Sequence, residues 1–398
     1  MRERYAAPAL ILGEGITVLG TLRCLGTAGI PCYCLSHTSD IETASRWYRL
    51  LPKEFGLVSD TYQLASFLES LPFENAVLIP CSDDWAVATA ALPDSLRKRF
   101  YISQPGLVIQ KSFTDKGRFR ALLKKHLIPH PHTYSPANEQ SLKDLLDQLP
   151  VDEISHYFLK PRDSLSFCRH FKAKAFSLTS TEDALQKYRT AREAGFEMLL
   201  QEYVSGPPHN HYYVEGFIDR NGVMRCVYAR QRLRMYPPKF GNSSIFVSIP
   251  ASDIQQAVES VRKLLGGVGY RGIYSAEFKR DERDGVYKLL EVNSRCWWYI
   301  EFLERCGVNI PEMAYRDALG LEVKNVAHYS LGTRAVYLRL DILAGLSEIR
   351  AGRLSIWRWL KFWIGAKYTV LCLRDPLPAF VWFYSKVRAV LLRMIGRR

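Results

Sequence analysis

The sequence predicts a protein of mixed α/β and α+β class, with a βαβ domain, a larger α+β body and a helical C-terminal extension. Three observations support this prediction: a strand–loop–helix–strand pattern over residues 9–35, two antiparallel hairpins near 212–230 and 273–295, and a basic, aromatic segment after residue 350. The 398 residues, 47% hydrophobic and 24% charged, suit two or three folded domains. This composition excludes a disordered chain, a collagen and a disulfide scaffold.

The N-terminal pattern begins with a buried strand that ends in the turn Gly13-Glu14-Gly15. These glycines match only the start of a dinucleotide-binding fingerprint, because Val18 stands where its third glycine belongs. We therefore favour a tight turn over an NAD site. A second strand at 76–79 leads into the loop 80–84.

Ser82, Asp83 and Asp84 occupy that loop, at the carboxyl end of the strand, where open α/β sheets bind small ligands. Capping of the following helix is the simpler role for each of these three residues.

Lys160 ends an apolar, strand-like run over 157–161. A lysine at the end of a buried strand is costly unless it meets an anion, so Lys160 is a candidate for binding phosphate. Farther along, Arg230, Arg232 and Arg234 alternate on a strand that returns from the turn 219–222. A period of two places the three arginines on one face, either as a solvated edge or as a clamp for a carboxylate or triphosphate.

The most informative segment is the hairpin 273–295, which alternates, turns at 281–285 and alternates again. Glu277 is expected opposite Glu291, and paired positions hold their side chains close together. Two opposed carboxylates repel, so a cation is expected between them. Two carboxylates and the Asn293 amide suit Mg²⁺ bridging phosphates, and Arg295 suits a transferred phosphoryl group.

In order and spacing, five motifs together resemble the ATP-grasp superfamily over residues 8–325. The motifs are Asp115-Lys116, Phe158-Leu159-Lys160-Pro161, Leu200 to Gly206, Glu277-Phe278 and Glu291-Val292-Asn293-Ser294-Arg295. The run Gly307 to Pro311 resembles the carboxylate–amine ligases related to D-aspartate ligase. The resemblance implies an ATP-grasp fold preceded by a βαβ domain like the N-terminal domain of biotin carboxylase.

The resemblance also implies domain bounds and nucleotide contacts. The expected units are 1–105, an ATP-grasp domain at 106–325 with a hinge near 200–206, and an extension at 326–398. ATP would be bound at its phosphates by Lys116 and Lys160. The adenine-facing hinge would consist of Gln201, Glu202, Tyr203 and Val204, with Glu202 near the exocyclic amine or the ribose and Val204 bonding through its backbone.

The remaining implied roles concern the metal and the reaction. One or two Mg²⁺ ions would be held by Glu277, Glu291 and Asn293. Arg295 would stabilise the transferred phosphoryl group, and Arg232 or Arg234 would receive phosphate or the substrate carboxylate.

Two departures from the family pattern concern the nucleotide site. The loop after Lys160 reads Arg162-Asp163-Ser164-Leu165-Ser166 and lacks the glycines that usually cover the phosphates. Asn210 stands near the ribose position, where relatives often have an acid.

The implied activity is ATP- and magnesium-dependent joining of a carboxylate to an amine through an acyl phosphate, with release of ADP and phosphate. The alternatives are a catalytically weak ATP-binding sensor, ligation to a non-amine acceptor, and a phosphotransferase that stops at the phosphorylated acid. The small-molecule carboxylate and amine are the expected partners.

The charge of +14 is concentrated at the C-terminus, where residues 350–398 hold eleven Lys or Arg and one Asp. Nine aromatic residues lie among them. This pattern suits an anionic membrane surface or helices docked on the body, with nucleic acid as the less favoured partner. Nine unpatterned cysteines and no evident signal peptide lead us to expect a cytoplasmic protein, with peripheral attachment at the inner face of the membrane as an extension of that expectation.

Overall fold

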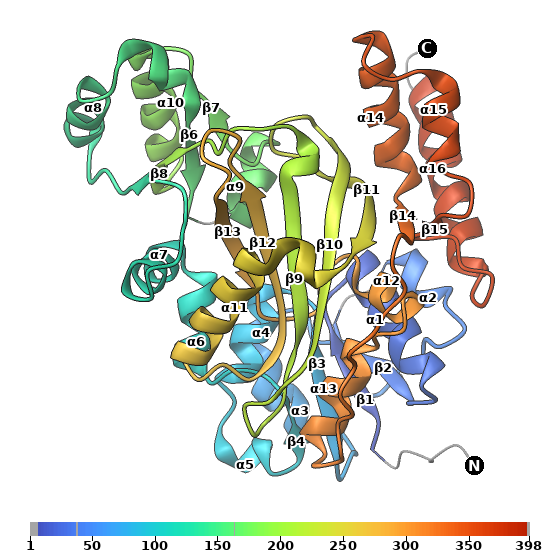
Figure 1. The fold of residues 1–398 in the computed structure, drawn as a ribbon. Helices are drawn as coiled ribbons and strands as arrows, with labels where there is room; N and C mark the ends of the chain where they lie inside the picture. The colour runs from blue at the N-terminus through green and yellow to red at the C-terminus, as the bar shows by residue number, and fades with distance from the viewer. Residues whose placement is uncertain (1–6, 37–38, 163, 396–398) are drawn as a thin grey trace.

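The computed structural model describes residues 7–36, 39–162 and 164–395, which form three sheets with helices around them (Figure 1). The expected mixed α/β and α+β class is confirmed. One buried apolar cluster joins the N-terminal domain, the largest sheet and the C-terminal extension, so these parts share a core.

The N-terminal domain is a parallel sheet in the order β2-β1-β3-β4. Its strands are β1 (Ala9–Leu12), β2 (Cys32–Cys34), β3 (Ala76–Pro80) and β4 (Phe100–Tyr101), and its helices are α1 (Ile16–Thr27), α2 (Asp40–Thr43), α3 (Leu64–Ser70), α4 (Asp83–Ala90) and α5 (Asp94–Arg97). Gly13 has φ +139°, and a Cβ there would lie 2.8 Å from the Cβ of Cys81. The tight turn favoured over an NAD fingerprint is therefore what the chain forms.

A small antiparallel sheet in the order β5-β8-β6-β7 follows the helices α6 (Leu107–Thr114) and α7 (Lys116–Lys125). Its strands are β5 (Thr133–Tyr134), β6 (Tyr157–Pro161), β7 (Phe176–Ser177) and β8 (Met198–Glu202), and its helices are α8 (Glu139–Asp147), α9 (Ser164–Phe171) and α10 (Thr181–Glu193). The buried strands expected at 157–161 and 198–202 are confirmed.

Helix α9 stands where the sequence suggested a loop over the phosphates. Asp163 lies outside the described residues. Phe167 is fully buried, and its ring packs on those of Phe171, Phe176 and Phe196 at 4.7 to 5.3 Å. Because Phe167 and Phe171 are one helical turn apart, this aromatic cluster favours a helix over an open loop.

The largest sheet has the order β13-β12-β9-β10-β11-β14-β15 and is antiparallel except for its last pair. Its strands are β9 (His211–Ile218), β10 (Met224–Tyr236), β11 (Asn242–Ile249), β12 (Gly272–Arg280), β13 (Tyr287–Asn293), β14 (Arg334–Val336) and β15 (Lys367–Tyr368). Helix α11 (Gln255–Gly267) packs on one face through buried aliphatic residues. The opposite face carries the polar residues of the site.

The C-terminal extension is part of the body, because β14 and β15 complete the largest sheet. It also contributes helices α14 (Leu338–Arg350), α15 (Ile356–Lys361) and α16 (Leu377–Ile395), and the connection before it holds α12 (Ile300–Arg305) and α13 (Ile310–Ala318). Docking on the body, one of the alternatives for this segment, is therefore observed for the inner sides of its helices. Within the described part of the chain, no helix has the length and apolar content needed to cross a membrane.

Candidate functional site

Two acids face each other across the hairpin β12–β13. Glu277 pairs with Glu291, and Ser275 pairs with Asn293 two residue pairs away, so the register expected from the sequence is confirmed. A register shift follows directly after Glu277, between it and Phe278. The two carboxylates and the amide thus belong to one face of an antiparallel ladder, two residue pairs apart.

Glu277 is held by two basic side chains. Arg232 Nη2 donates to Glu277 Oε1 at 2.9 Å, and His211 Nδ1 lies 3.0 Å from the same oxygen. Burial alone would raise the pKa of Glu277, but Arg232 and His211 offset it and hold this pKa well below its ordinary value. Glu277 is therefore a carboxylate at any physiological pH.

His211 is neutral in this arrangement. Burial and the nearby Arg232 lower the pKa of His211 to about 4, although Glu277 acts in the opposite direction. At pH 7 the ring therefore adds no charge, and Arg232 supplies the positive charge beside Glu277.

The donor set of the hairpin fits Mg²⁺. Within the described ranges, no three His, Cys, Asp or Glu side chains form a metal-binding group. Glu277, Glu291 and Asn293 instead offer only oxygen atoms, which are the ligands that Mg²⁺ prefers when phosphates complete its coordination. These three residues would hold the ion between the sheet and a nucleotide.

The two lysines predicted to bind phosphate belong to segments that are in contact at the end of strand β6. Lys116 is the first residue of α7, and its Nζ donates to the carbonyl oxygen of Pro161, the residue after Lys160. Lys160 is half-buried, and the described residues offer its amino group no hydrogen bond or ion pair. The structure therefore places the Lys116 amino group beside the residue that follows Lys160.

The hinge residues have partners that change one expectation. Gln201 Nε2 donates to Thr133 Oγ1 at 2.9 Å. The Glu202 carboxylate accepts from the backbone N–H of His132 at 3.0 Å, from Lys288 at 3.3 Å and from Arg283. Burial raises the pKa of Glu202, but these donors lower it overall. These three donors already bind the Glu202 carboxylate, so the expected side-chain contact of Glu202 with adenine or ribose is not supported.

The remaining hinge residues border the larger sheet. The ring of Tyr203 lies 4.2 Å below Lys279 Nζ, and Val204 is buried next to it in sequence. Asn210 follows in a short 3₁₀ helix (Pro208–Asn210), where its Nδ2 donates to the carbonyl of Arg280 at 3.1 Å. Its amide thus joins the hinge to the β12–β13 turn.

The three alternating arginines have different partners. The register of β10 against β11 shifts between Arg232 and Arg234, so strict alternation breaks there. Arg230 makes a bidentate pair with Glu215 at 2.9 and 3.0 Å, and Arg234 makes one with Asp341 of the extension at 3.0 Å. Asp341 thus occupies Arg234, and Glu277, Ser243 and Tyr213 are bonded to Arg232, so the role of either arginine with phosphate or substrate stays a prediction.

Arg295 contacts the N-terminal domain. Its Nε and Nη2 donate to the two oxygens of Asp83 at 3.0 and 3.3 Å. Asp83 is the first residue of α4, next to the Ser82 hydroxyl that caps this helix. The loop 80–84, predicted to lie at the substrate end of the first sheet, therefore meets the arginine assigned to phosphoryl transfer.

Two further cations border the site, and the sequence did not assign them a role. Lys279 is 3% exposed and faces Tyr203. Lys174 lies between α9 and β7 and donates to Asn242 Oδ1 at 2.6 Å. The carboxylates of Glu291 and Glu277 favour its charged form. Lys279 shares a strand face with Glu277 and was detectable by alternation, whereas no local pattern marks Lys174.

Comparison of the whole chain with solved structures identifies its architecture. It superposes on N5-carboxyaminoimidazole ribonucleotide synthetase bound to ADP with a TM-score of 0.63 and 13% identity, over 83% of this chain and 82% of the other. It matches the biotin carboxylase domain of Hydrogenobacter thermophilus 2-oxoglutarate carboxylase, in complex with MgADP, with a TM-score of 0.61 and 14% identity, over 82% and 73%. The chain has the ATP-grasp fold.

Sequence comparison agrees with this fold. The D-aspartate ligase of Enterococcus faecium is 22% identical over 322 residues, which are 77% of this chain and 76% of that enzyme. No family model matches the chain. The predicted resemblance to ATP-grasp enzymes of the D-aspartate ligase type is thereby confirmed.

Proposed function

We propose that the protein is an ATP- and magnesium-dependent ligase that joins a carboxylate to an amine and releases ADP and phosphate. The observation that carries the proposal is the pairing of Glu277 with Glu291, two residue pairs from Asn293, in an ATP-grasp fold. The named relatives support this reaction class, since they include a D-aspartate ligase and structures in complex with ADP and MgADP.

The first chemical step forms an acyl phosphate. A carboxylate oxygen of the substrate attacks the γ-phosphorus of ATP, the bond from that phosphorus to the β–γ bridging oxygen breaks, and ADP leaves. Lys116 and Lys160 bind the phosphates, while Arg295 stabilises the transferring group. Magnesium, held by Glu277, Glu291 and Asn293, would neutralise phosphate charge.

The second step forms the amide. The amine nitrogen attacks the acyl carbon, the bond from that carbon to the phosphate oxygen breaks, and inorganic phosphate leaves as the nitrogen loses a proton. Arg232 sits beside Glu277 and receives the released phosphate or the substrate carboxylate. Most of the rate enhancement would come from positioning and from stabilising charge.

One observation favours an ATP-binding sensor as the second candidate. Helix α9 stands where glycine-rich loops of the family cover the phosphates, so this chain closes its nucleotide site differently. Lys174 follows this helix near Glu277 and Glu291, so the segment after β6 carries a positive charge beside the two acids. The complete set Glu277, Glu291, Asn293 and Arg295 favours the ligase.

An ADP-release screen of carboxylates crossed with amines, including amino acids and uronic-acid sugars, tests the ligase. The ligase requires ADP formation that depends on both substrates and on magnesium. Tight MgATP binding without turnover for any pair would favour the sensor, and ADP release with the carboxylate alone would favour the phosphotransferase. Turnover with hydroxyl or thiol acceptors in place of amines would point to ligation of a non-amine.

The proposed site of action is the cytoplasm, where ATP and small carboxylates and amines are available. We also propose peripheral attachment to the inner face of a membrane, supported by the basic and aromatic residues of the extension.

A further inference from the structure

The extension exposes large apolar side chains on the outer sides of its helices. In α16 the outward residues are Leu377, Phe380, Phe383, Tyr384 and Val387, spaced by three and four positions. Phe380 is 69% and Tyr384 67% exposed. The opposite side of α16 packs inward, where Trp382 lies against Tyr337 with ring centroids 6.4 Å apart. The helix is therefore apolar on both sides, and its outer stripe is largely exposed.

Helix α15 likewise has a buried side and an exposed apolar side. Trp359 is buried, and both Trp359 and Trp363 donate their indole N–H groups to Asp341 at 2.9 and 2.8 Å. The outward side presents Trp357, which is 74% exposed, and the turn after α15 presents Ile364, which is 72% exposed. Leu373, in the connection to α16, is 93% exposed. Figure 1 shows α14, α15 and α16 together along one side of the molecule.

The charge around these stripes is positive. The extension contains only three acids, and a basic residue neutralises each of them: Arg234 pairs with Asp341, Arg353 with Glu348 and Arg23 with Asp375. The exposed cations, by contrast, include Arg358, Lys361, Lys386 and Arg388. The surface is thus apolar and cationic, which complements an anionic bilayer.

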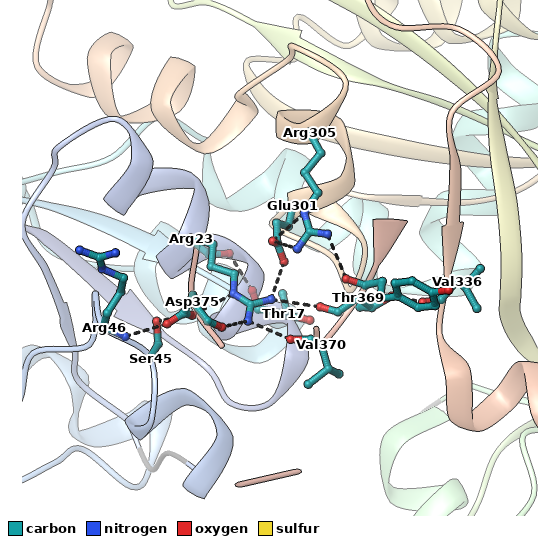
Figure 2. A network of polar contacts seen from close by, with 12 residues as sticks. Thr17, Arg23, Ser45, Arg46, Glu301, Arg305, Val336, Thr369, Val370 and Asp375 are labelled. Carbon is teal, nitrogen blue, oxygen red and sulfur yellow. Dashed lines mark hydrogen bonds and ion pairs between the residues drawn. The ribbon is translucent and has the colours of Figure 1, made fainter. Parts of the chain in front are cut away.

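The inner attachment of the extension is independent of this surface. Figure 2 shows Arg23 of α1 bound by Asp375 and Glu301 at 3.0 Å each, with the carbonyls of Thr369 and Val370 as further acceptors at 3.2 and 2.9 Å. Arg23 and Asp375 are each 1% exposed. Since this buried network holds the segment 369–375, the outward apolar residues are not needed to dock the extension.

We propose that the outer face of the extension, formed by the exposed residues of α15, α16 and their connection, binds the surface of an anionic phospholipid bilayer. The apolar stripes enter the boundary between head groups and acyl chains, and Lys361, Lys386 and Arg388 contact lipid phosphates. Leu373, Leu377 and Ile364 are aliphatic and strongly exposed, which favours lipid over the stacked bases of nucleic acid. This inference specifies the surface behind the proposed membrane location and does not depend on ligase activity.

Flotation of the full chain with vesicles tests the proposal. The wild type is expected to float with phosphatidylcholine–phosphatidylglycerol vesicles, to release at high salt and to bind pure phosphatidylcholine weakly. The triple variant Phe380→Ser, Phe383→Ser, Tyr384→Ser and the pair Lys386→Glu, Arg388→Glu should each bind anionic vesicles about tenfold more weakly.

Matched controls lie on the body. Tyr62→Ser removes an aromatic side chain that is 94% exposed, and Lys124→Glu with Lys125→Glu reverses two exposed lysines of α7. Both controls should bind vesicles as the wild type does, and circular dichroism establishes that every variant folds.

Three outcomes would overturn the proposal. The first is wild-type protein that stays unbound with anionic vesicles, or triple and charge-reversal variants that bind as well as the controls. The second is preferential binding of an oligonucleotide that displaces the vesicles. The third is a lipid-free dimer that the triple variant abolishes, because the surface would then face a second copy of this chain.

Discussion

At the residue scale, Lys279 is a buried cation that makes no ion pair with an acid among the residues that the structure describes. It is 3% exposed, its amino group lies over the ring of Tyr203, and Arg232 is nearby. Burial and Arg232 lower its pKa to about 8, while the more distant Glu282 and Asp281 act in the opposite direction. Keeping Lys279 charged therefore costs folding stability. Its position between the hinge and Glu277 suits it to bind an anionic ligand such as a nucleotide phosphate.

Replacing this lysine should separate stability from binding. Between pH 8 and 10.5 the unfolded chain binds more protons than the folded one, so stability rises with pH there and charged Lys279 destabilises the fold at pH 7. Lys279→Met should therefore raise the free energy of unfolding at pH 7 by about 1 to 3 kcal/mol. The same change should weaken MgATP binding about tenfold, measured by titration calorimetry.

Lys288 provides the matched control, because it stands directly opposite Lys279 in the ladder and pairs with Asp281 at 2.8 Å and with Glu202 at 3.3 Å. Lys288→Met should lower stability. In the wild type, MgATP affinity should fall as the pH rises through about 8, and this step should be absent in Lys279→Met. Equal ATP affinity of Lys279→Met and wild type would rule out the nucleotide role.

Asp83 should act as a positioning residue for Arg295. Its two oxygens bind the guanidinium at 3.0 and 3.3 Å, so Asp83→Asn leaves Arg295 less well oriented. We expect kcat to fall about tenfold to a hundredfold with an unchanged Kd for ATP. Asp84→Asn, one residue along the same helix, should leave kcat unchanged. Loss of ATP affinity in Asp83→Asn, in proportion to kcat, would indicate a structural role instead.

The local sequence pattern predicted some contacts of the site residues and missed others, for a physical reason. Alternation within one hairpin was enough to oppose Glu277 and Glu291, because strand register depends on nearby sequence. The pair formed by Arg295 and Asp83 spans 212 residues, and no local period encodes such a tertiary contact. The same holds for Arg234, whose acid Asp341 comes from the extension.

At the element scale, strands with strong alternation were predictable and the segment after β6 was not. The absence of glycine from that segment was visible in the sequence, but helix α9 depends on Phe167 meeting Phe176 and Phe196 from other elements. Similarly, the strands β14 and β15 have three and two residues, too few for a pattern. Their place in the largest sheet is set by their neighbours.

The attachment of the extension to α1 makes a prediction at this scale. Arg23→Met leaves Asp375 and part of Glu301 buried without their cation, which should destabilise the docked segment 369–375 by about 3 to 5 kcal/mol. Hydrogen exchange of this segment should accelerate, while that of the hairpin β12–β13 stays slow.

Arg46→Met is the control, since its exposed guanidinium makes only one contact across this boundary in the described structure, to the Arg374 carbonyl at 3.3 Å. Unchanged exchange of 369–375 in Arg23→Met would mean that apolar packing alone docks the extension.

At the scale of the whole molecule, charge and chemistry are separated. The surplus of +10 over residues 350–398 lies in the extension, where the body neutralises two of the three acids through Arg23 and Arg234. In the proposed site, Lys116, Lys160 and Arg295 would bind the anionic groups, with Lys279 as an addition. We therefore expect overall charge to bear on location and the proposed reaction to depend on a few side chains from separate elements.

The fate of labelled oxygen tests the central claim most directly. With a carboxylate substrate labelled with ¹⁸O and its amine partner, the acyl phosphate route transfers one ¹⁸O into inorganic phosphate and produces ADP, as measured by mass spectrometry. Glu291→Ala should abolish this transfer while the fold remains intact. Formation of AMP with label in pyrophosphate or AMP, or unlabelled phosphate beside ADP, would contradict the account.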